Sequence, residues 1–393
     1  MSKPVQAREL YELFALDRRL TDEQRALKKV LRDFSDRELR PHIAEWFESG
    51  EIPARELAKK FGSLGLLGMH LDGYGCPGAD SLSYGLACLE LESVDSGLRS
   101  LVSVQGSLSM FAIYAYGSES QKQEWLPRMA QGEAIGCFGL TEADFGSNPS
   151  GMRTTARRDG SDWIINGSKM WITNGNIADV AIIWANSDEG IRGFCVPTST
   201  PGFKANLIKH KLSLRASITS ELVFENLRVP DQYRLPEAKS LRAPLMCLAE
   251  ARFGIVFGSI GAARDCLETA LHYGKSRVQF DRPISGYQLT QAKYAEMAAS
   301  ISTSLLLAYH LADLKDDEKI EPEHISLGKY HNVKSALEVA RSARSILGGA
   351  GITTEYPIFR HMSNLETVLT YEGTHEIHTL VIGQALTGEN AIR

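Results

Sequence analysis

The chain has 393 residues, which is enough for two or three domains and a large buried core. Its apolar content of 43% and its charged content of 23% are typical of a soluble globular protein. The net charge of −5 argues against a chain-wide basic surface for nucleic acid or for an anionic membrane.

Targeting and redox signals point to a cytoplasmic protein. No secretory signal is visible near Met1, and the longest strongly apolar run, Val180–Ala185, is too short to span a bilayer. We therefore expect no stable membrane insertion. The cysteines at positions 76, 88, 137, 195, 247 and 266 form no CxxC pair. They are expected to be reduced, buried thiols.

Residues 1–132 have the pattern of an N-terminal helical domain. Thr21 to Gln24 are typical of a helix N-cap, and Pro53 opens a further helical segment. The segments Ser83–Leu91 and Leu101–Tyr116 are almost entirely apolar, which predicts helices buried inside a bundle.

Residues 133–235 change to short β-type runs separated by turns. Asn166-Gly167 lies between two apolar runs and predicts a hairpin turn, and Asp188 to Gly190 predict another. Several short strands at regular spacing predict a central antiparallel β-sandwich or barrel domain.

Residues 236–393 return to helix. The segments Ile255–His272, Gln288–Leu314 and His324–Leu347 are amphipathic, and Lys315–Glu323 between the last two predicts a charged surface loop. The order helix, strand, helix predicts an α+β fold that ends in a C-terminal four-helix-type bundle.

One stretch near the C-terminus, Leu369 to His378, combines a carboxylate with a helix start. A helical run from about Ile358 to Thr370 precedes Glu372 and Gly373, and Thr374 is well placed to cap the next helix. The first turn of a helix offers unpaired N–H groups, which suit an anion or a polar cofactor. Alternatively, Glu372 only supports the helix start electrostatically.

Several signatures are absent from the sequence. There is no G-x-S-x-G, no G-x-G-x-x-G after a strand and no G-x-x-x-x-G-K, which argues against α/β-hydrolases, Rossmann sites and P-loops. His375 and His378 are three residues apart rather than four and have no evident third ligand, so we expect no metal site.

Four further stretches could contact a cofactor. Gly136–Glu142 continues into Gly146–Pro149 at the helix-to-strand junction, and Trp171–Thr173 ends a predicted strand. Arg277–Phe280 offers a cation for a pyrophosphate, and Ser345–Gly351 could admit phosphates against its backbone. Three of them also have a purely structural explanation: Gly136–Pro149 as an interdomain turn, Trp171 as core and the Ser345–Gly351 glycines as a helix C-cap.

Taken in order, Gly-Leu-Thr-Glu, Trp-Ile-Thr, Arg-x-Gln-Phe, Leu-Gly-Gly-x-Gly and Tyr-Glu-Gly-Thr resemble the acyl-CoA dehydrogenase family along nearly the whole chain. The resemblance implies FAD, a homotetramer, an acyl-CoA substrate and an electron-transfer flavoprotein as electron acceptor. It places these residues at FAD: Phe138, Leu140, Thr141, Ser147, Trp171, Ile172, Thr173, Thr374 and Glu376. A second set would reach the FAD of a neighbouring subunit: Arg277, Phe280, Gln288, Ile346, Leu347, Gly348 and Gly349.

The resemblance also implies that Glu372 is the catalytic base. Some family members carry the base just before the arginine that corresponds to Arg252, but Ala251 occupies that position here. Glu250 is one residue away and would face a different direction on its helix. By the same resemblance, Arg252 and Gly373 would contact the substrate.

A substrate carboxylate could bind Arg99, which follows a nearly all-apolar segment. Arginine is rarely buried unless paired, so Arg99 either forms a salt bridge with Glu92 or Asp95, or receives that carboxylate. The stretches Val94-Asp95-Ser96-Gly97, Arg99, Ser103-Val104-Gln105 and Leu212 to Ser217 resemble the glutaryl-CoA dehydrogenase subfamily, although Leu98 stands where that subfamily usually has tyrosine. The implied substrate contacts are Arg99, Ser100, Ser103 and Ser147, with Thr173 also lining the carboxylate pocket.

The implied reaction is oxidation of glutaryl-CoA to crotonyl-CoA with loss of CO2. One alternative is a short-chain acyl-CoA dehydrogenase or oxidase that acts on an uncharged acyl chain, with oxygen as a possible electron acceptor. Another is a flavin-free helical scaffold with a degenerate site.

Overall fold

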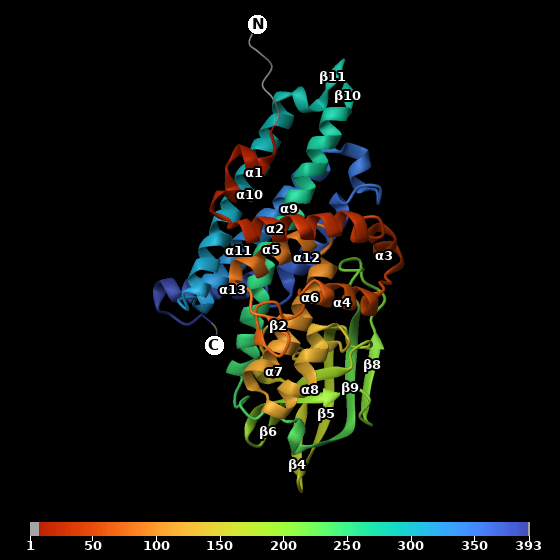
Figure 1. The fold of residues 1–393 in the computed structure, drawn as a ribbon, viewed down its shortest axis with the longest axis vertical. Coiled ribbons are helices and arrows are strands. Elements are labelled where there is room, and N and C mark those ends of the chain that lie inside the picture. Colours follow the sequence, from red (N-terminus) through yellow and green to blue (C-terminus); the bar gives the residue numbers. More distant parts are fainter. Residues whose placement is uncertain (1–7, 392–393) are drawn as a thin grey trace.

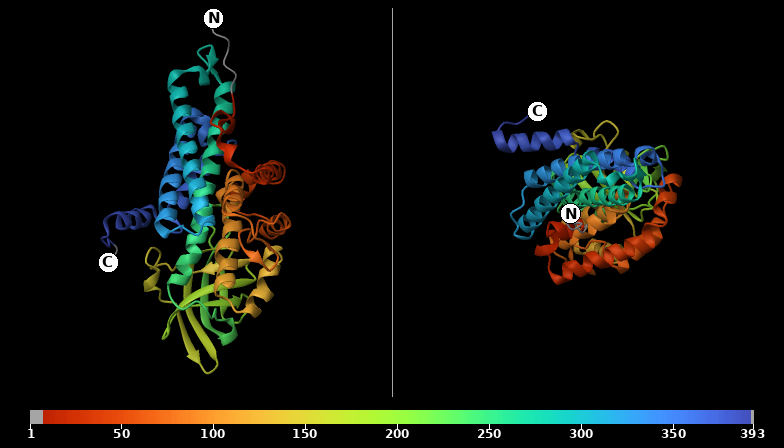
Figure 2. Two further views of the ribbon diagram at one scale, coloured as in Figure 1. Left: turned by 60° about the vertical axis from the view of Figure 1, so that its left-hand side comes forward. Right: turned by 90° about the horizontal axis from the view of Figure 1, so that it is seen from above.

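A computed structural model describes residues 8–391 and places a seven-stranded sheet at one end of a long helical bundle (Figure 1). The helices of the first third of the chain lie along one side of the C-terminal helices, as both views in Figure 2 show. One continuous hydrophobic core joins these helices to the near face of the sheet. The predicted α+β fold class is confirmed.

The N-terminal part is built from short helices and one small hairpin. The helices are α1 (Leu10–Leu13), α2 (Asp22–Phe34), α3 (Ile43–Ser49), α4 (Ala54–Ser63), α5 (Ser81–Glu92), α6 (Ser96–Ser103), α7 (Phe111–Tyr116) and α8 (Glu119–Ala130), and the hairpin is β1 (Asp72–Gly73) with β2 (Cys76–Pro77). Thr21 and Gln24 form the predicted capping box. Every residue of α5 and α6 is buried, and a π-helical turn, Val104–Met110, joins α6 to α7.

The sheet order is β3-β6-β4-β5-β9-β8, with β7 also paired to β6. The strands are β3 (Gly136–Gly139), β4 (Thr155–Asp159), β5 (Asp162–Thr173), β6 (Val180–Ser187), β7 (Gly190–Pro197), β8 (Phe203–Leu207) and β9 (Thr219–Pro230). Most pairs are antiparallel, as predicted, but β3 runs parallel to β6 along its whole length. Alternate residues of β6 face the helices or a second, separate core within the sheet.

The predicted hairpin at Asn166-Gly167 is wrong. β5 continues through both residues, and its register against β9 shifts there, which marks a bulge. Gly167 has φ +141°, and a Cβ atom on it would lie 2.6 Å from the Thr154 hydroxyl. Glycine at this position therefore allows β5 to lie close to Thr154. The chain reverses earlier, between Asp159 and Asp162.

The C-terminal part contains the long helices. They are α9 (Arg242–Ser276), α10 (Gln288–Asp316), α11 (Pro322–Ile346), α12 (Ile358–Thr370) and α13 (His375–Thr387), and a small hairpin of β10 (Val278–Gln279) and β11 (Arg282–Pro283) joins α9 to α10. Among residues 8–391, α9 is the one helix long and apolar enough to cross a membrane, but 72% of its most apolar window is buried inside the protein. Its apolar composition is that of a core helix.

All six cysteines are free thiols. Five are buried, as predicted, and Cys76 is partly exposed because it lies in the small N-terminal hairpin. Lys315, predicted to begin a surface loop, instead lies in the last turn of α10 and binds Glu250 at 2.7 Å.

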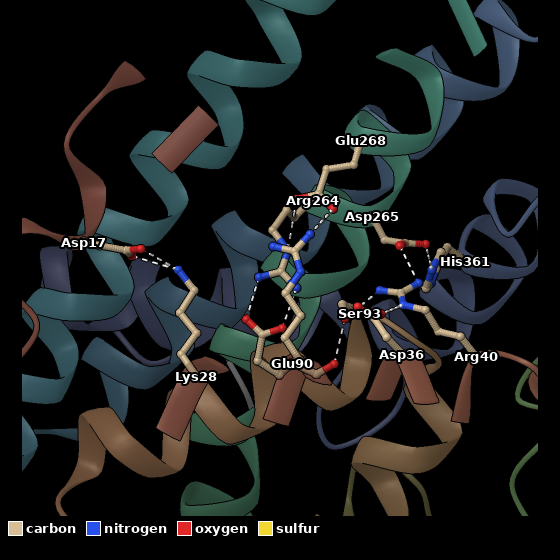
Figure 3. A network of polar contacts seen from close by, with 11 residues as sticks. Asp17, Lys28, Asp36, Arg40, Glu90, Ser93, Arg264, Asp265, Glu268 and His361 are labelled. Carbon is tan, nitrogen blue, oxygen red and sulfur yellow. Dashed lines mark hydrogen bonds and ion pairs between the residues drawn. The ribbon is translucent and has the colours of Figure 1, made fainter. Parts of the chain in front are cut away.

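Buried ion pairs fasten α9 to the N-terminal helices (Figure 3). Arg264 on α9 donates to both carboxylate oxygens of Glu90 on α5, at 2.6 and 2.7 Å, and neither side chain is more than 1% exposed. The next residue, Asp265, binds Arg40 at 2.6 Å and His361 of α12 at 3.0 Å. The helix that carries Arg252 is thus held on two sides.

Replacing Arg264 with leucine should lower the free energy of unfolding by about 3–5 kcal/mol, because it leaves the Glu90 carboxylate buried and unpaired. The double variant Arg264→Leu/Glu90→Leu should recover much of this loss. Arg341→Leu is the matched control, because its partner Glu366 and Arg341 itself are both more than half exposed. Urea unfolding measures all three, and equal losses for Arg264→Leu and Arg341→Leu would contradict the assignment.

Candidate active site

The segment Tyr371-Glu372-Gly373 links α12 to α13. α12 spans Ile358–Thr370 as predicted, and the Thr374 hydroxyl accepts a hydrogen bond from the Ile377 N–H at 3.2 Å, so it caps α13. Glu372 has φ +52° and Gly373 has φ +92°. A left-handed backbone is unfavourable for glutamate, so the surrounding structure must hold it.

Two cations from neighbouring helices bind the three backbone carbonyls of this segment. Arg252 Nε of α9 donates to the Glu372 carbonyl at 2.6 Å. Lys329 Nζ of α11 donates to the Gly373 carbonyl at 2.5 Å and also to the Tyr371 carbonyl. These contacts fix the backbone on both sides of Glu372.

The side-chain carboxylate of Glu372 takes no part in these backbone hydrogen bonds. Its Oε2 atom is shielded from solvent and has no hydrogen-bond partner among residues 8–391. Burial raises the pKa of Glu372 above its usual value, while the nearby charges of Arg99, Lys329 and Arg252 act in the opposite direction. A half-buried carboxyl group with a raised pKa and one shielded, unpartnered oxygen is suited to exchange a proton with a ligand.

Arg99, on α6, lies next to this segment. Its Nε atom donates to Glu92 at 2.7 Å, with both side chains fully buried, and its Nη2 atom donates to the Tyr371 hydroxyl. Burial lowers the pKa of the Arg99 guanidinium, but Tyr371, Glu92 and Glu372 raise it by more. The pKa of Arg99 therefore lies above its usual value. The predicted salt bridge therefore forms with Glu92, whereas Asp95 caps α6 through the Gly97 N–H.

Three unpartnered polar atoms mark the space around Glu372 and α6. Arg99 Nη1, Ser103 Oγ and Glu372 Oε2 are all buried and lack hydrogen-bond partners within the described part of the chain. Arg99 and Ser103 lie four residues apart and so share one face of the helix, and Ser100 beside them is 2% exposed. Buried polar atoms are normally satisfied, so these atoms indicate a site for a polar ligand.

Two of the predicted flavin-contact stretches, Leu140–Thr141 and Trp171–Thr173, lie side by side. The Thr141 carbonyl accepts from the Met170 N–H at 2.8 Å, which places Thr141 beside Trp171. Trp171 has φ +64° and is 59% exposed, an uncommon state for a large apolar residue at a strand end. Its exposed ring offers a flat apolar surface. Phe138, Leu140 and Ile172 are buried, Thr173 is partly buried and Ser147 is exposed.

A loop connects this strand end to the helix before Glu372. Thr173 pairs with Thr219 of β9, and Lys211 donates to the Thr219 hydroxyl at 2.8 Å and to the Leu214 carbonyl at 2.9 Å. The Leu214 N–H in turn donates to Asn364 of α12 at 2.7 Å. The end of β5 and the helix before the base therefore share one hydrogen-bonded connection.

The second predicted set lies elsewhere. Arg277 caps the far end of α9, which is 35 residues long, so it lies roughly 38 Å along the helix from Arg252. Lys293 binds Ser345 at 2.9 Å, which brings the start of α10, with Gln288, beside the end of α11, with Ile346 to Gly349. Phe280 is 87% exposed. Within one chain the β10–β11 hairpin that follows Arg277 lies at the end of the bundle away from the sheet and from α13 (Figure 1).

Other acidic and histidine candidates have separate contacts. Glu250 binds Lys315. His375 stacks on Tyr330 with ring centroids 4.2 Å apart, and His378 Nδ1 contacts the Ser326 hydroxyl at 3.1 Å. Residues 8–391 contain no group of three or more side chains arranged to hold a metal ion.

Sequence reasoning missed Lys329 and assigned no role to Gln105 beyond its place in the Ser103-Val104-Gln105 stretch. Lys329 lies four residues after Ile325 and four before Val333, so it belongs to the apolar face of α11. A lysine within that apolar pattern is the feature of the sequence that could have indicated its role. Gln105 lies in the buried π-helical turn, where it donates to the Ala134 carbonyl and accepts from the Gly136 N–H, both at 2.8 Å. It fixes the start of β3, the strand that contains Phe138.

Comparison with known proteins gives consistent matches along the chain. Residues 21–133, 137–227 and 241–387 match the N-terminal, middle and C-terminal domains of acyl-CoA dehydrogenase. A glutaryl-CoA dehydrogenase from Mycobacterium smegmatis, also solved in complex with FADH2, is 62% identical with a TM-score of 0.97, covering 98% of this chain and 100% of its own.

More distant relatives also match over most of their length. The human mitochondrial short-chain specific acyl-CoA dehydrogenase is 35% identical, over 92% of this chain and 90% of its own. A structure reported for the electron transferring flavoprotein of Acidaminococcus fermentans is 36% identical with a TM-score of 0.90, covering 94% of this chain and 99% of that one.

The conformation of the loop after Thr141 should depend on the Glu142 carboxylate. This carboxylate accepts from Lys169 at 2.8 Å and from the N–H groups of Arg153 and Thr154 at 2.7 and 2.9 Å. Glu142→Ala leaves Lys169 buried without its charge partner and should cost about 3–5 kcal/mol. Glu225→Ala is the control, since its lysine pair with Lys204 is more than half exposed.

Limited proteolysis and urea unfolding measure this effect. Glu142→Ala should become cleavable between residues 142 and 154, and Glu225→Ala should behave as the wild type. Equal resistance of the two variants would contradict a role of Glu142 in holding this loop.

Proposed function

The chain belongs to the acyl-CoA dehydrogenase family, and we propose that it oxidises glutaryl-CoA to crotonyl-CoA and CO2. The observation that carries this proposal is the unpartnered Nη1 atom of Arg99, buried near the Glu372 carboxylate. A buried arginine with one free N–H group suits an acyl chain that ends in a carboxylate.

FAD is the cofactor that this family membership and the relative bound to FADH2 support. The exposed Trp171 ring, with Thr141 beside it, would contact the isoalloxazine, and Ser147 would bind the cofactor near the same edge. Thr374 and the exposed Glu376 at the start of α13 would contact FAD from the bundle. Bound FAD supplies the acceptor for the hydride that leaves the β-carbon.

Glu372 would act as the general base. A thioester carbonyl makes its α-hydrogen weakly acidic, and the N–H of Glu372 is the proposed donor to that carbonyl. The Glu372 carboxylate takes the α-proton while the β-hydrogen leaves as hydride. Burial raises the pKa of Glu372, which makes its ionised form a stronger base.

Arg99 would hold the distal carboxylate of the glutaryl chain, with Ser100 and Ser103 lining the same pocket. After oxidation, the bond to that carboxylate breaks, CO2 leaves, and the electron pair is conjugated with the thioester. Protonated Glu372 then returns its proton to carbon to give crotonyl-CoA. Arg99 must therefore bind the carboxylate without stabilising it so strongly that CO2 release stops.

The alternative is a short-chain enzyme that acts on an uncharged acyl group. The 62% identity to a glutaryl-CoA dehydrogenase, against 35% to the human short-chain enzyme, supports the charged substrate. Leu98 is fully buried, and Arg99 and Ser103 provide polar atoms that an uncharged chain would leave unsatisfied.

We also propose a homotetramer in the cytoplasm that passes electrons to an electron-transfer flavoprotein. Arg277 lies roughly 38 Å along α9 from Arg252. We propose that Arg277, Phe280, Gln288 and Ile346 to Gly349 contact the flavin of a neighbouring subunit. The exposed apolar side chains of Val278, Phe280 and Leu289 at this end of the bundle support such a contact.

Glu372→Gln should bind acyl-CoA but reduce the flavin at least about 100-fold more slowly, because it removes the general base. Glu250→Gln is the matched control and should keep its rate, since Glu250 pairs with Lys315 instead. In the wild type, the rate of flavin reduction should rise as the pH passes the pKa of Glu372, because only the ionised carboxylate accepts the α-proton. Burial raises this pKa above the usual value of glutamate.

Anaerobic stopped-flow absorbance of the flavin measures both effects. Flavin reduction by Glu372→Gln at a rate comparable to the wild type would exclude this base.

Arg99→Met should lower kcat/KM for glutaryl-CoA by about 10- to 100-fold, the loss expected for one charge-assisted hydrogen bond. Butyryl-CoA, which has no distal carboxylate, serves as the internal control and should be affected much less. Steady-state rates with both substrates, together with mass analysis of the products, make the comparison. Equal losses on both substrates would mean that Arg99 is purely structural.

A further inference from the structure

Lys329 is an unusual residue for the interior of a helical bundle. It is 2% exposed and forms no salt bridge in the part of the chain that the structure describes. Its ammonium group instead donates to the carbonyls of Tyr371 and Gly373. Buried lysines are normally paired, so its position requires an explanation.

The two carbonyls that Lys329 binds flank Glu372 on either side. Since the carbonyl between them binds Arg252, three consecutive peptide groups point at two cations. This arrangement fixes the ψ angle of Tyr371 and both dihedrals of Glu372, including its positive φ. The Glu372 side chain and its N–H therefore have a defined direction without any contact to the carboxylate itself.

We propose that Lys329 is a positioning residue for the base: it holds the Glu372 backbone in its left-handed conformation, and its charge favours the ionised carboxylate. This inference rests on the proposed function of Glu372 as the base. It assigns a role to Lys329, which takes part in none of the proposed chemical steps. Lys329 touches neither substrate nor flavin in this account and acts through Glu372 alone.

The local charges agree with this role. Burial lowers the pKa of Lys329 to about 7, while the Glu372 carboxylate raises it, so the ammonium and the carboxylate favour each other's charged form. Other titratable or charged groups also face this segment from the surrounding elements: Glu92 from α5, Arg99 from α6, Arg252 from α9, and His375 and His378 from α13, together with Tyr371 of the segment itself. Burial holds the pKa of His378 at about 3, so that ring stays neutral near pH 7.

Lys329→Met tests the proposal because it removes the charge and both hydrogen bonds while keeping a long side chain. Lys28→Met is the matched control: Lys28, on α2, is also largely buried, but it binds the carboxylate of Asp17 and is not among the charges that act on Glu372. Should Lys329→Met fail to fold, as judged by its thermal midpoint, Lys329→Gln takes its place with the same expected results, since it also removes the charge.

The first readout is hydrogen–deuterium exchange of the peptide covering residues 369–378, measured by mass spectrometry on the FAD-bound protein without substrate. Exchange in this peptide should be several-fold faster in Lys329→Met and unchanged in Lys28→Met. The second readout is the pH profile of flavin reduction by glutaryl-CoA. Its acidic limb should move up by about one pH unit in Lys329→Met, since a cation that favoured the Glu372 carboxylate is lost.

Unchanged exchange in Lys329→Met, or an acidic limb that stays at the wild-type position, overturns the proposal. If no acyl-CoA reduces the wild-type flavin, the proposed function fails instead. Exchange then decides alone whether Lys329 holds the Glu372 segment.

Discussion

The proposed chemistry depends on the Glu372 carboxylate, which is half-buried, lies near three positive charges and forms no salt bridge with them in the described part of the chain. Arg252 and Lys329 bind backbone carbonyls around Glu372, and two of the three Arg99 nitrogens bind Glu92 and Tyr371. Their field offsets part of the several kcal/mol that burial of a carboxylate costs, while Oε2 stays free of hydrogen bonds. A direct salt bridge would have given a more stable glutamate and a weaker base.

Rigid helices make this arrangement possible. α9 contributes Arg252 and is itself fixed through Arg264 and Asp265, and α11 contributes Lys329 from a buried face. The exposed Trp171 ring on the sheet is tied to the same region by the loop that contains Leu214. The sheet thus presents an exposed ring for the proposed planar cofactor and the bundle presents the proposed base. Arg277 and Phe280 lie beyond the end of α9, where the proposed neighbouring subunit would contact them.

Local features were predictable from the sequence, and tertiary ones were not. The bounds of α12 and the Thr374 cap follow from periodicity and capping over a few residues. Asn166-Gly167 has the composition of a turn, but packing against Thr154 makes it a bulge inside β5. The Lys329 contacts join residues more than forty positions apart, which no local pattern encodes. The assigned roles of the flavin-contact residues came from family resemblance, and they remain proposals for this chain.

The most direct test of the central claim separates proton abstraction from hydride transfer. An acyl-CoA analogue with sulfur in place of the β-carbon cannot lose a hydride, yet its α-hydrogens remain acidic. In D2O, the FAD-bound protein should exchange these α-hydrogens for deuterium, as followed by NMR, and Glu372→Gln should lose this exchange. Exchange by the wild type no faster than in buffer, or undiminished in Glu372→Gln, would contradict the account.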